Sequence, residues 1–153
     1  MPFVYEHSVY WQKVQEETKG SGDFERSTCL FIDSENAREH TEEEMIPVEN
    51  IKGRLFLVGA EDDSFWETGK YIRRMDERLK ERPHTCEYVP LVYEHGTHFV
   101  LPESLLRKAL PVGLKFVMRF IFKAAKEYPN ECEKTRKDID RRLSSALKEW
   151  REE

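Results

Sequence analysis

The stretch that decides the fold is residues 54–98, RLFLVGAEDDSFWETGKYIRRMDERLKERPHTCEYVPLVYEHGTH. It opens with a continuous apolar run that ends at a glycine, which is typical of a buried parallel strand. Apolar or small residues then recur at helical spacing, and a second strand-like run follows. A strand, a helix and a strand make a βαβ unit, whose right-handed crossover leaves the strands parallel. We therefore predict adjacent parallel strands at 54–60 and 86–93 with a crossover helix at 66–81. That helix should pack three side chains onto the sheet: Ile72, Met75 and Leu79.

The rest of the chain is organised around this unit. At 153 residues the chain fits a single domain, which we divide into a lid-like or pocket-like region (1–45), the βαβ unit (46–102) and C-terminal helices (103–153). The first C-terminal helical stretch has a wide apolar face that we expect to pack on the core: Val112, Phe116, Val117, Phe120, Ile121, Ala124 and Tyr128. A narrower face follows at Ile139, Leu143, Ala146, Leu147 and Trp150. Basic residues between the apolar ones mark a wet side, so we expect no membrane contact.

Composition excludes several function classes. The net charge of −5 and a pI near 5.7 disfavour a nucleic-acid binder, which needs a basic face. No apolar run is long enough to span a bilayer, and the chain does not open with a secretory signal pattern. The three cysteines, Cys29, Cys86 and Cys132, are odd in number and show no CxxC spacing. We expect reduced thiols, a cytoplasmic location and no cofactor.

A carboxylate and a histidine follow the two predicted strands. Asp62 lies three residues after Gly59, and His98 lies two residues after Gly96. Functional groups in α/β sheets gather beyond the carboxyl ends of the strands. An acid followed by a histidine is also the order of the last two members of a Ser…Asp…His triad. In such a triad the carboxylate fixes the imidazole tautomer, and the histidine carries a proton between nucleophile and leaving group.

The runs IPVENIKGRLFLVGAEDDSFWETGKYIRRMDERL (46–79) and YEHGTHFVLPESL (93–105) resemble the C-terminal part of the acyl-CoA thioester hydrolase and bile-acid-CoA:amino-acid N-acyltransferase family. That family belongs to the α/β-hydrolase superfamily, and the resemblance covers roughly residues 46–102. It implies an α/β fold class: the C-terminal portion of an α/β-hydrolase, with a parallel βαβ unit, flanking helices and an incomplete sheet.

The resemblance also assigns site residues. It implies Asp62 as the catalytic acid and His98 as the catalytic histidine. Asp63 is the alternative acid, or a cap for the following helix. His95 is expected to support the site from behind or to face solvent. We expect an Asp62 carboxylate oxygen within hydrogen-bonding reach of a His98 ring nitrogen.

The nucleophile is missing from this pattern. The family places it upstream, on a strand-to-helix elbow flanked by glycines, and no G-x-S-x-G occurs in the sequence. Cys29 precedes the acid and the histidine in the correct order. However, it has no neighbouring glycine, and too few residues separate it from Asp62 for the usual intervening elements. We expect Cys29 to be a packed cysteine.

Three functions stay open on the sequence. The first is an acyl (thio)ester hydrolase or acyltransferase region that carries the acid and histidine of a Ser/Cys–His–Asp triad, with an acyl thioester or ester as substrate of the complete protein. The second is a non-catalytic interaction or dimerisation module, either a homodimer or a partner of an N-terminal half supplied in trans. The third is a metal site built from Glu94, His95, His98 and an aspartate. We expect no metal, because this spacing lies in a turn rather than on a helix.

Overall fold

The computed structural model describes residues 40–111 and 113–152, together with Gln12, Gln15, Glu16, Lys19, Ile32, Glu35 and Asn36. Cys29, Val112 and most of the region 1–45 lie outside the described residues. Two short 3-10 helices, η1 (Glu42–Glu44) and η2 (Val48–Asn50), lead into strand β1 (Arg54–Ala60), helix α4 (Thr68–Glu81) and strand β2 (Glu87–Tyr93). Four helices follow: α5 (Glu103–Ala109), α6 (Leu114–Ile121), α7 (Lys123–Glu127) and α8 (Pro129–Glu152).

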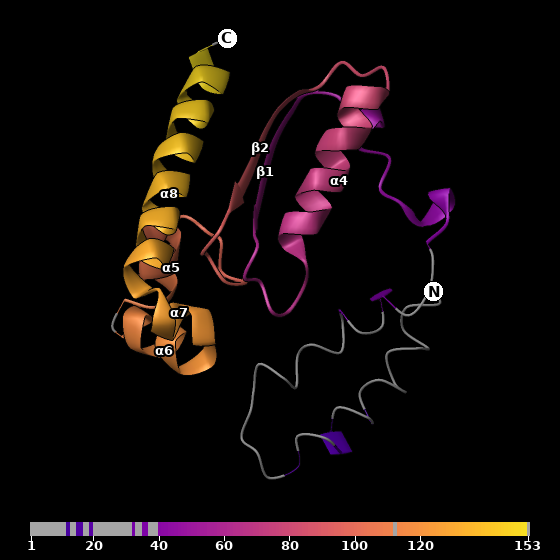
Figure 1. Ribbon diagram of the computed structural model, residues 1–153. Helices are drawn as coiled ribbons and strands as arrows, with labels where there is room; N and C mark the ends of the chain where they lie inside the picture. Colours follow the sequence, from indigo (N-terminus) through magenta and orange to yellow (C-terminus); the bar gives the residue numbers. More distant parts are fainter. Residues whose placement is uncertain are drawn as a thin grey trace.

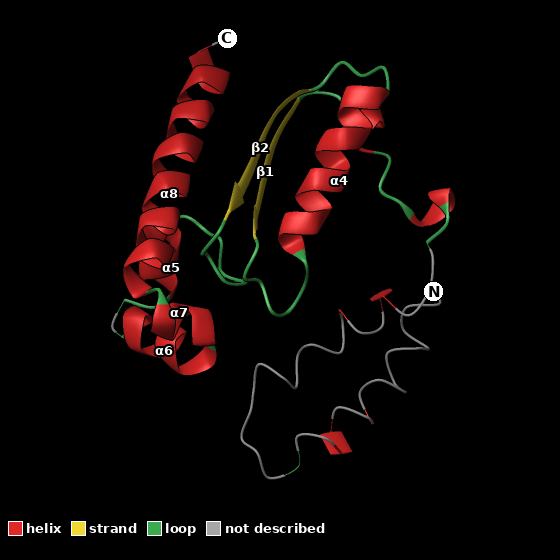
Figure 2. Cartoon of the chain, in the orientation of Figure 1, coloured by secondary structure: helices red, strands yellow, loops and turns green. Residues whose placement is uncertain are grey.

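The two strands form the predicted parallel pair. β1 and β2 are hydrogen-bonded side by side, with Arg54 opposite Glu87 and Ala60 opposite Tyr93. Figures 1 and 2 show the strands running together, with α4 on one side of them and α8 on the other. The βαβ prediction is confirmed, and both strands end at the same edge of the sheet. The chain therefore has a small parallel sheet flanked by helices, which is a partial α/β fold.

Helix α4 covers one face of the sheet as predicted. Ile72 and Leu79 are buried, and Met75 packs against a cluster that includes Leu79. Gly59 permits this close approach, because a Cβ atom there would lie 2.7 Å from the backbone carbonyl group of Thr68. The helix begins at Thr68, two residues later than predicted, since the preceding residues form a turn around a buried carboxylate.

Helix α8 anchors the opposite face. Tyr93 at the end of β2 donates a hydrogen bond from its hydroxyl to Asp138 at 2.8 Å. Nearby, the guanidinium of Arg136 bonds the Glu103 carboxylate at 2.7 Å, and both side chains are buried. This buried ion pair fixes α5 against α8, because moving the two helices apart would leave the buried Arg136 without its carboxylate partner, whereas Glu103 would keep Arg107 of α5 at 2.9 Å.

The apolar face predicted for the first C-terminal helix is partly wrong. Val117 and Ile121 pack against the core cluster, but Phe116 and Phe120 are 75% and 82% exposed. The buried positions of this region are instead Leu114, Met118, Phe122 and Ala125. The backbone becomes extended at Phe122 between α6 and α7. The prediction treated the segment as one continuous helix and therefore assigned the wrong side chains to its buried face.

Candidate functional site

The loops that follow the two strands meet at one edge of the sheet. The Glu61 N–H donates a hydrogen bond to the Tyr93 carbonyl at 2.8 Å, which ties the beginnings of the two loops together. The first loop carries two adjacent aspartates, and the second carries two histidines on either side of a glycine and a threonine. Each aspartate faces a different histidine.

Asp63 is the carboxylate that faces His98. The Nδ1 atom of His98 lies 3.2 Å from both carboxylate oxygens of Asp63, whose side chain is completely buried. The same carboxylate accepts the backbone N–H groups of Phe65 and Trp66 at 3.0 and 3.1 Å and the Thr68 hydroxyl at 2.9 Å. A buried carboxylate with this many donors is held in one orientation, so it can orient the imidazole that it contacts.

Asp62 has a different partner set. Its Oδ1 atom accepts the backbone N–H groups of Gly96 and Thr97 at 2.9 and 2.7 Å, and its Oδ2 atom lies 3.3 Å from Nδ1 of His95. Thr97 is buried and has a φ of 60°, an unfavourable conformation for a β-branched residue. The Asp62 carboxylate therefore stabilises the turn that presents His98.

The predicted Asp62–His98 contact is wrong, because His98 pairs with the neighbouring carboxylate. The two aspartates are adjacent in sequence, and spacing from Gly59 cannot tell which one turns toward the second strand. A signal for Asp63 does exist. Asp63 lies shortly before the crossover helix, where a capping residue is expected. In the structure its carboxylate accepts the N–H groups of Phe65 and Trp66, in the turn before α4, and also faces His98.

Aromatic rings hold the His98 imidazole on several sides. The Phe65 ring stacks on it with centroids 4.8 Å apart, and the Trp66 ring approaches edge-on at 5.0 Å. Phe99 adds a second edge contact at 5.8 Å. The His98 side chain is still 24% exposed, so a reacting group can reach it from solvent.

His95 is built into the support of the turn. Its ring stacks on Tyr128 with centroids 3.9 Å apart, and its carbonyl accepts the Thr135 hydroxyl at 2.5 Å. Gly96 is required beside it, since a Cβ atom there would lie 2.6 Å from a methyl carbon of Val100 and 3.1 Å from Cβ of Ala60. The turn is thus packed directly against the end of β1 and against α8.

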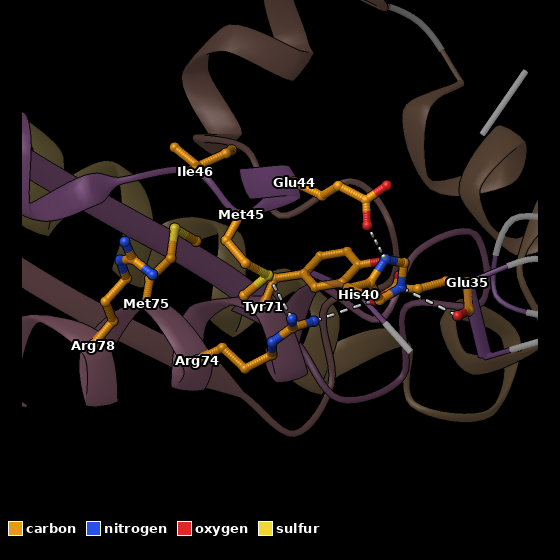
Figure 3. A pocket seen from close by; sticks show the side chains of 9 residues that line it. All are labelled: Glu35, His40, Glu44, Met45, Ile46, Tyr71, Arg74, Met75 and Arg78. Atoms are coloured by element: carbon orange, nitrogen blue, oxygen red, sulfur yellow. Dashed lines mark hydrogen bonds and ion pairs between the residues drawn. The ribbon is translucent and has the colours of Figure 1, made fainter. Parts of the chain in front are cut away.

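A cavity of about 340 Å³ lies beside α4, away from this pair of loops. Figure 3 shows the His40 ring between Glu44 and Glu35, with Arg74 near Met45. Arg74 contacts Glu35 at 3.3 Å and the Met45 sulfur at 2.8 Å. Glu35, His40, Glu44 and Arg74 are therefore in contact with one another or with Met45 around an apolar interior, while Arg78 pairs with Glu42 and Glu49 outside the lining. The lining residues are Glu35, His40, Glu44, Met45, Ile46, Tyr71, Arg74, Met75 and Arg78.

The histidines and acids do not converge as a metal site would. His95 and His98 contact different aspartates, and the described part of the chain holds no group of three metal-ligating side chains. Cys86 and Cys132 are free and buried. Burial raises the pKa of the Cys132 thiol to about 11, so it stays protonated at neutral pH and is a poor nucleophile.

Comparison with known proteins identifies a family. The family model described as BAAT / acyl-CoA thioester hydrolase C terminal matches residues 3–104, about two thirds of the 153-residue chain. No curated protein matches the chain at the level of significance required. No solved structure matches it at that level either.

Proposed function

Because the chain belongs to the BAAT / acyl-CoA thioester hydrolase C-terminal family, we propose that it supplies the acid and the histidine of an acyl-transferring triad. Its substrate class is an acyl thioester or ester, and the reaction is hydrolysis or acyl transfer. The observation that carries the proposal is the contact of His98 Nδ1 with both oxygens of the buried Asp63, at 3.2 Å. We assign Asp63, in place of Asp62, as the acid.

The pair has the geometry that general-base catalysis needs. A carboxylate at Nδ1 favours the tautomer with hydrogen on that nitrogen, which leaves Nε2 as the proton acceptor. A serine or cysteine outside this sequence would transfer its proton to Nε2 as it attacks the acyl carbonyl. When the tetrahedral intermediate collapses, His98 returns that proton to the leaving thiol or alcohol, and Asp63 stabilises the imidazolium in between.

Asp62 is a positioning residue in this proposal. It binds the backbone of the turn and never contacts His98 directly. Through the turn it fixes where the imidazole of His98 lies, and a displacement of about 1 Å is enough to slow a proton transfer greatly.

The division of the chain into functional parts belongs to the same proposal. Residues 1–45 would shape the acyl pocket of the complete protein. A cytoplasmic location is also proposed. Among the described helices none is long and apolar enough to cross a membrane.

The open edge of β1 favours a second candidate, the interaction module. The sheet order is β1–β2, so within the described residues the other edge of β1 has no strand partner. Residues 55–58 carry neither a charge nor a proline that would block pairing. A second copy of the chain or an N-terminal half in trans would cover this edge. Light scattering combined with amide exchange at residues 55–58 tests it, and a monomer with rapidly exchanging amides would contradict it.

Chemical rescue tests the catalytic proposal. The 153-residue chain alone should not turn over a short acyl thioester, because His98 has no nucleophile to activate. An added small thiol should be acylated faster than in buffer, since His98 removes the proton as its sulfur attacks. His98→Gln and Asp63→Asn should abolish the acceleration.

His84→Gln, just before the start of β2 and therefore far from His98, is the matched control and should retain the acceleration. An acceleration that survives His98→Gln would contradict the proposal. Turnover without added thiol that disappears in Cys29→Ala would also contradict it, because the nucleophile would then lie within the chain.

A further inference from the structure

The exposed side of α6 presents two aromatic rings to solvent. Phe116 and Phe120 are 75% and 82% exposed, while Leu114 and Met118 of the same helix are buried. The two phenylalanines are four residues apart, so they lie one above the other on one helix face. Neighbouring aromatic side chains that are both this exposed indicate an interaction surface.

The same face is positively charged. Lys115 and Arg119 are exposed on α6 beside the two rings, and Lys123 is exposed just beyond it. Lys115 contacts Glu133 at 2.6 Å, yet its side chain remains 61% exposed. The wider segment between Glu103 and Glu127 contains no acidic residue. It does contain six basic ones: Arg107, Lys108, Lys115, Arg119, Lys123 and Lys126. This local excess contrasts with the net charge of −5 for the whole chain.

We propose that this face of α6, defined by Lys115, Phe116, Arg119, Phe120 and Lys123, docks onto an anionic lipid bilayer. Exposed phenylalanines flanked by lysine and arginine are the combination that binds the membrane interface: the rings enter the boundary between headgroups and acyl chains, and the cations contact anionic headgroups. The attachment is peripheral. It reverses our expectation of no membrane contact, which took the apolar face of this segment to pack on the core and its basic residues to mark an ordinary solvent-exposed side.

Charge argues for lipid over a second copy of the chain. A two-fold dimer through this face would bring two clusters of lysine and arginine against each other, and like charges at an interface are unfavourable. A bilayer rich in phosphatidylserine offers the complementary charge over a continuous surface. The proposal is independent of any catalytic role of His98, because none of the five residues contacts it among the interactions described above.

Vesicle co-sedimentation tests the docking. The full chain should bind vesicles of phosphatidylcholine and phosphatidylserine in a 7:3 ratio (about 30% anionic lipid), and it should bind pure phosphatidylcholine vesicles about tenfold more weakly. High salt should reduce binding to the anionic vesicles, because it screens the headgroup attraction. Phe116→Ala/Phe120→Ala should weaken binding about tenfold or more through the loss of apolar contact. Arg119→Glu should weaken it about fivefold or more.

The control is Leu147→Ala on α8, which removes another exposed apolar side chain and should leave binding unchanged. Thermal melting of each variant should match the wild type, because the altered side chains are on the surface. Absence of binding to the anionic vesicles would overturn the proposal. So would equal binding by the wild type and the phenylalanine variant. A fall in molar mass in light scattering, seen only for that variant, would show that the face joins copies of the chain instead.

Discussion

Removal of the Asp62 carboxylate should destabilise the turn that carries His98. In Asp62→Ala the N–H groups of Gly96 and Thr97 lose an acceptor at 2.9 and 2.7 Å, and both residues are buried. Leaving a buried donor unsatisfied costs about 1–3 kcal/mol. Two such donors predict a loss of about 3 kcal/mol in the free energy of unfolding, after allowance for partial access of water to the loop. This is a large share of the stability of a domain of this size.

Asp62→Asn separates hydrogen bonding from charge. The asparagine carbonyl can accept both N–H groups, so the loss should be about 1 kcal/mol or less. Urea denaturation followed by circular dichroism measures both variants, with unchanged m-values as the check that the unfolding transition is the same. Glu94→Gln, in the same loop and 87% exposed, is the control and should stay within about 0.5 kcal/mol of the wild type. An Asp62→Ala variant as stable as the wild type would refute the anchoring role.

Three further perturbations test the packing and the charges. Gly96→Ala should lower the free energy of unfolding by about 1–3 kcal/mol, because the added Cβ atom would lie 2.6 Å from a methyl carbon of Val100. A melting temperature equal to that of the wild type would contradict this. Arg136→Ala should lower the free energy of unfolding in urea by up to about 3 kcal/mol, because the buried Glu103 would keep only the exposed Arg107 at 2.9 Å as a partner, and a loss below about 1 kcal/mol would contradict this. Hydrogen bonds from Lys115 and Lys137 lower the pKa of Glu133 from 4.5 to about 2. The contribution of the Glu133 carboxylate to the free energy of unfolding is therefore complete above pH 4.5 and is lost as the pH falls toward 2. Glu133→Gln should therefore flatten the pH dependence of stability in that window, by less than about 1 kcal/mol because the group is near the surface, and an unchanged slope would contradict this.

The spacing of apolar residues predicted the fold correctly wherever those residues are the ones that the structure buries. The run at 55–60 is continuously apolar in a strand that α4 covers, and Gly59 is small because α4 crosses directly over it. The pattern failed at Phe116 and Phe120. A 3.6-residue projection assumes one unbroken helix, whereas the chain becomes extended at Phe122 and the buried stripe follows Leu114 and Met118 instead.

The carboxylate that faces His98 could be predicted to within one residue. The order of acid and histidine, and their places after parallel strands, follow from the sequence. The choice between Asp62 and Asp63 does not follow from the sequence. It depends on which carboxylate accepts hydrogen bonds from the backbone N–H groups of each of two separate turns. The Asp62 carboxylate accepts the N–H groups of Gly96 and Thr97. The Asp63 carboxylate accepts those of Phe65 and Trp66 and faces His98. These contacts are tertiary, so no local spacing encodes them.

The tautomer of His98 tests the central assignment most directly. Long-range ¹H–¹⁵N NMR spectra distinguish a hydrogen on Nδ1 from one on Nε2 in the neutral ring. With Asp63 as the partner, neutral His98 should carry its hydrogen on Nδ1 in the wild type and in Asp62→Asn. In Asp63→Ala the ring loses both oxygens that lie near Nδ1, so the hydrogen should move to Nε2, the tautomer that a histidine prefers in water. A hydrogen that moves to Nε2 in Asp62→Asn, or that stays on Nδ1 in Asp63→Ala, would contradict the assignment of Asp63 as the acid.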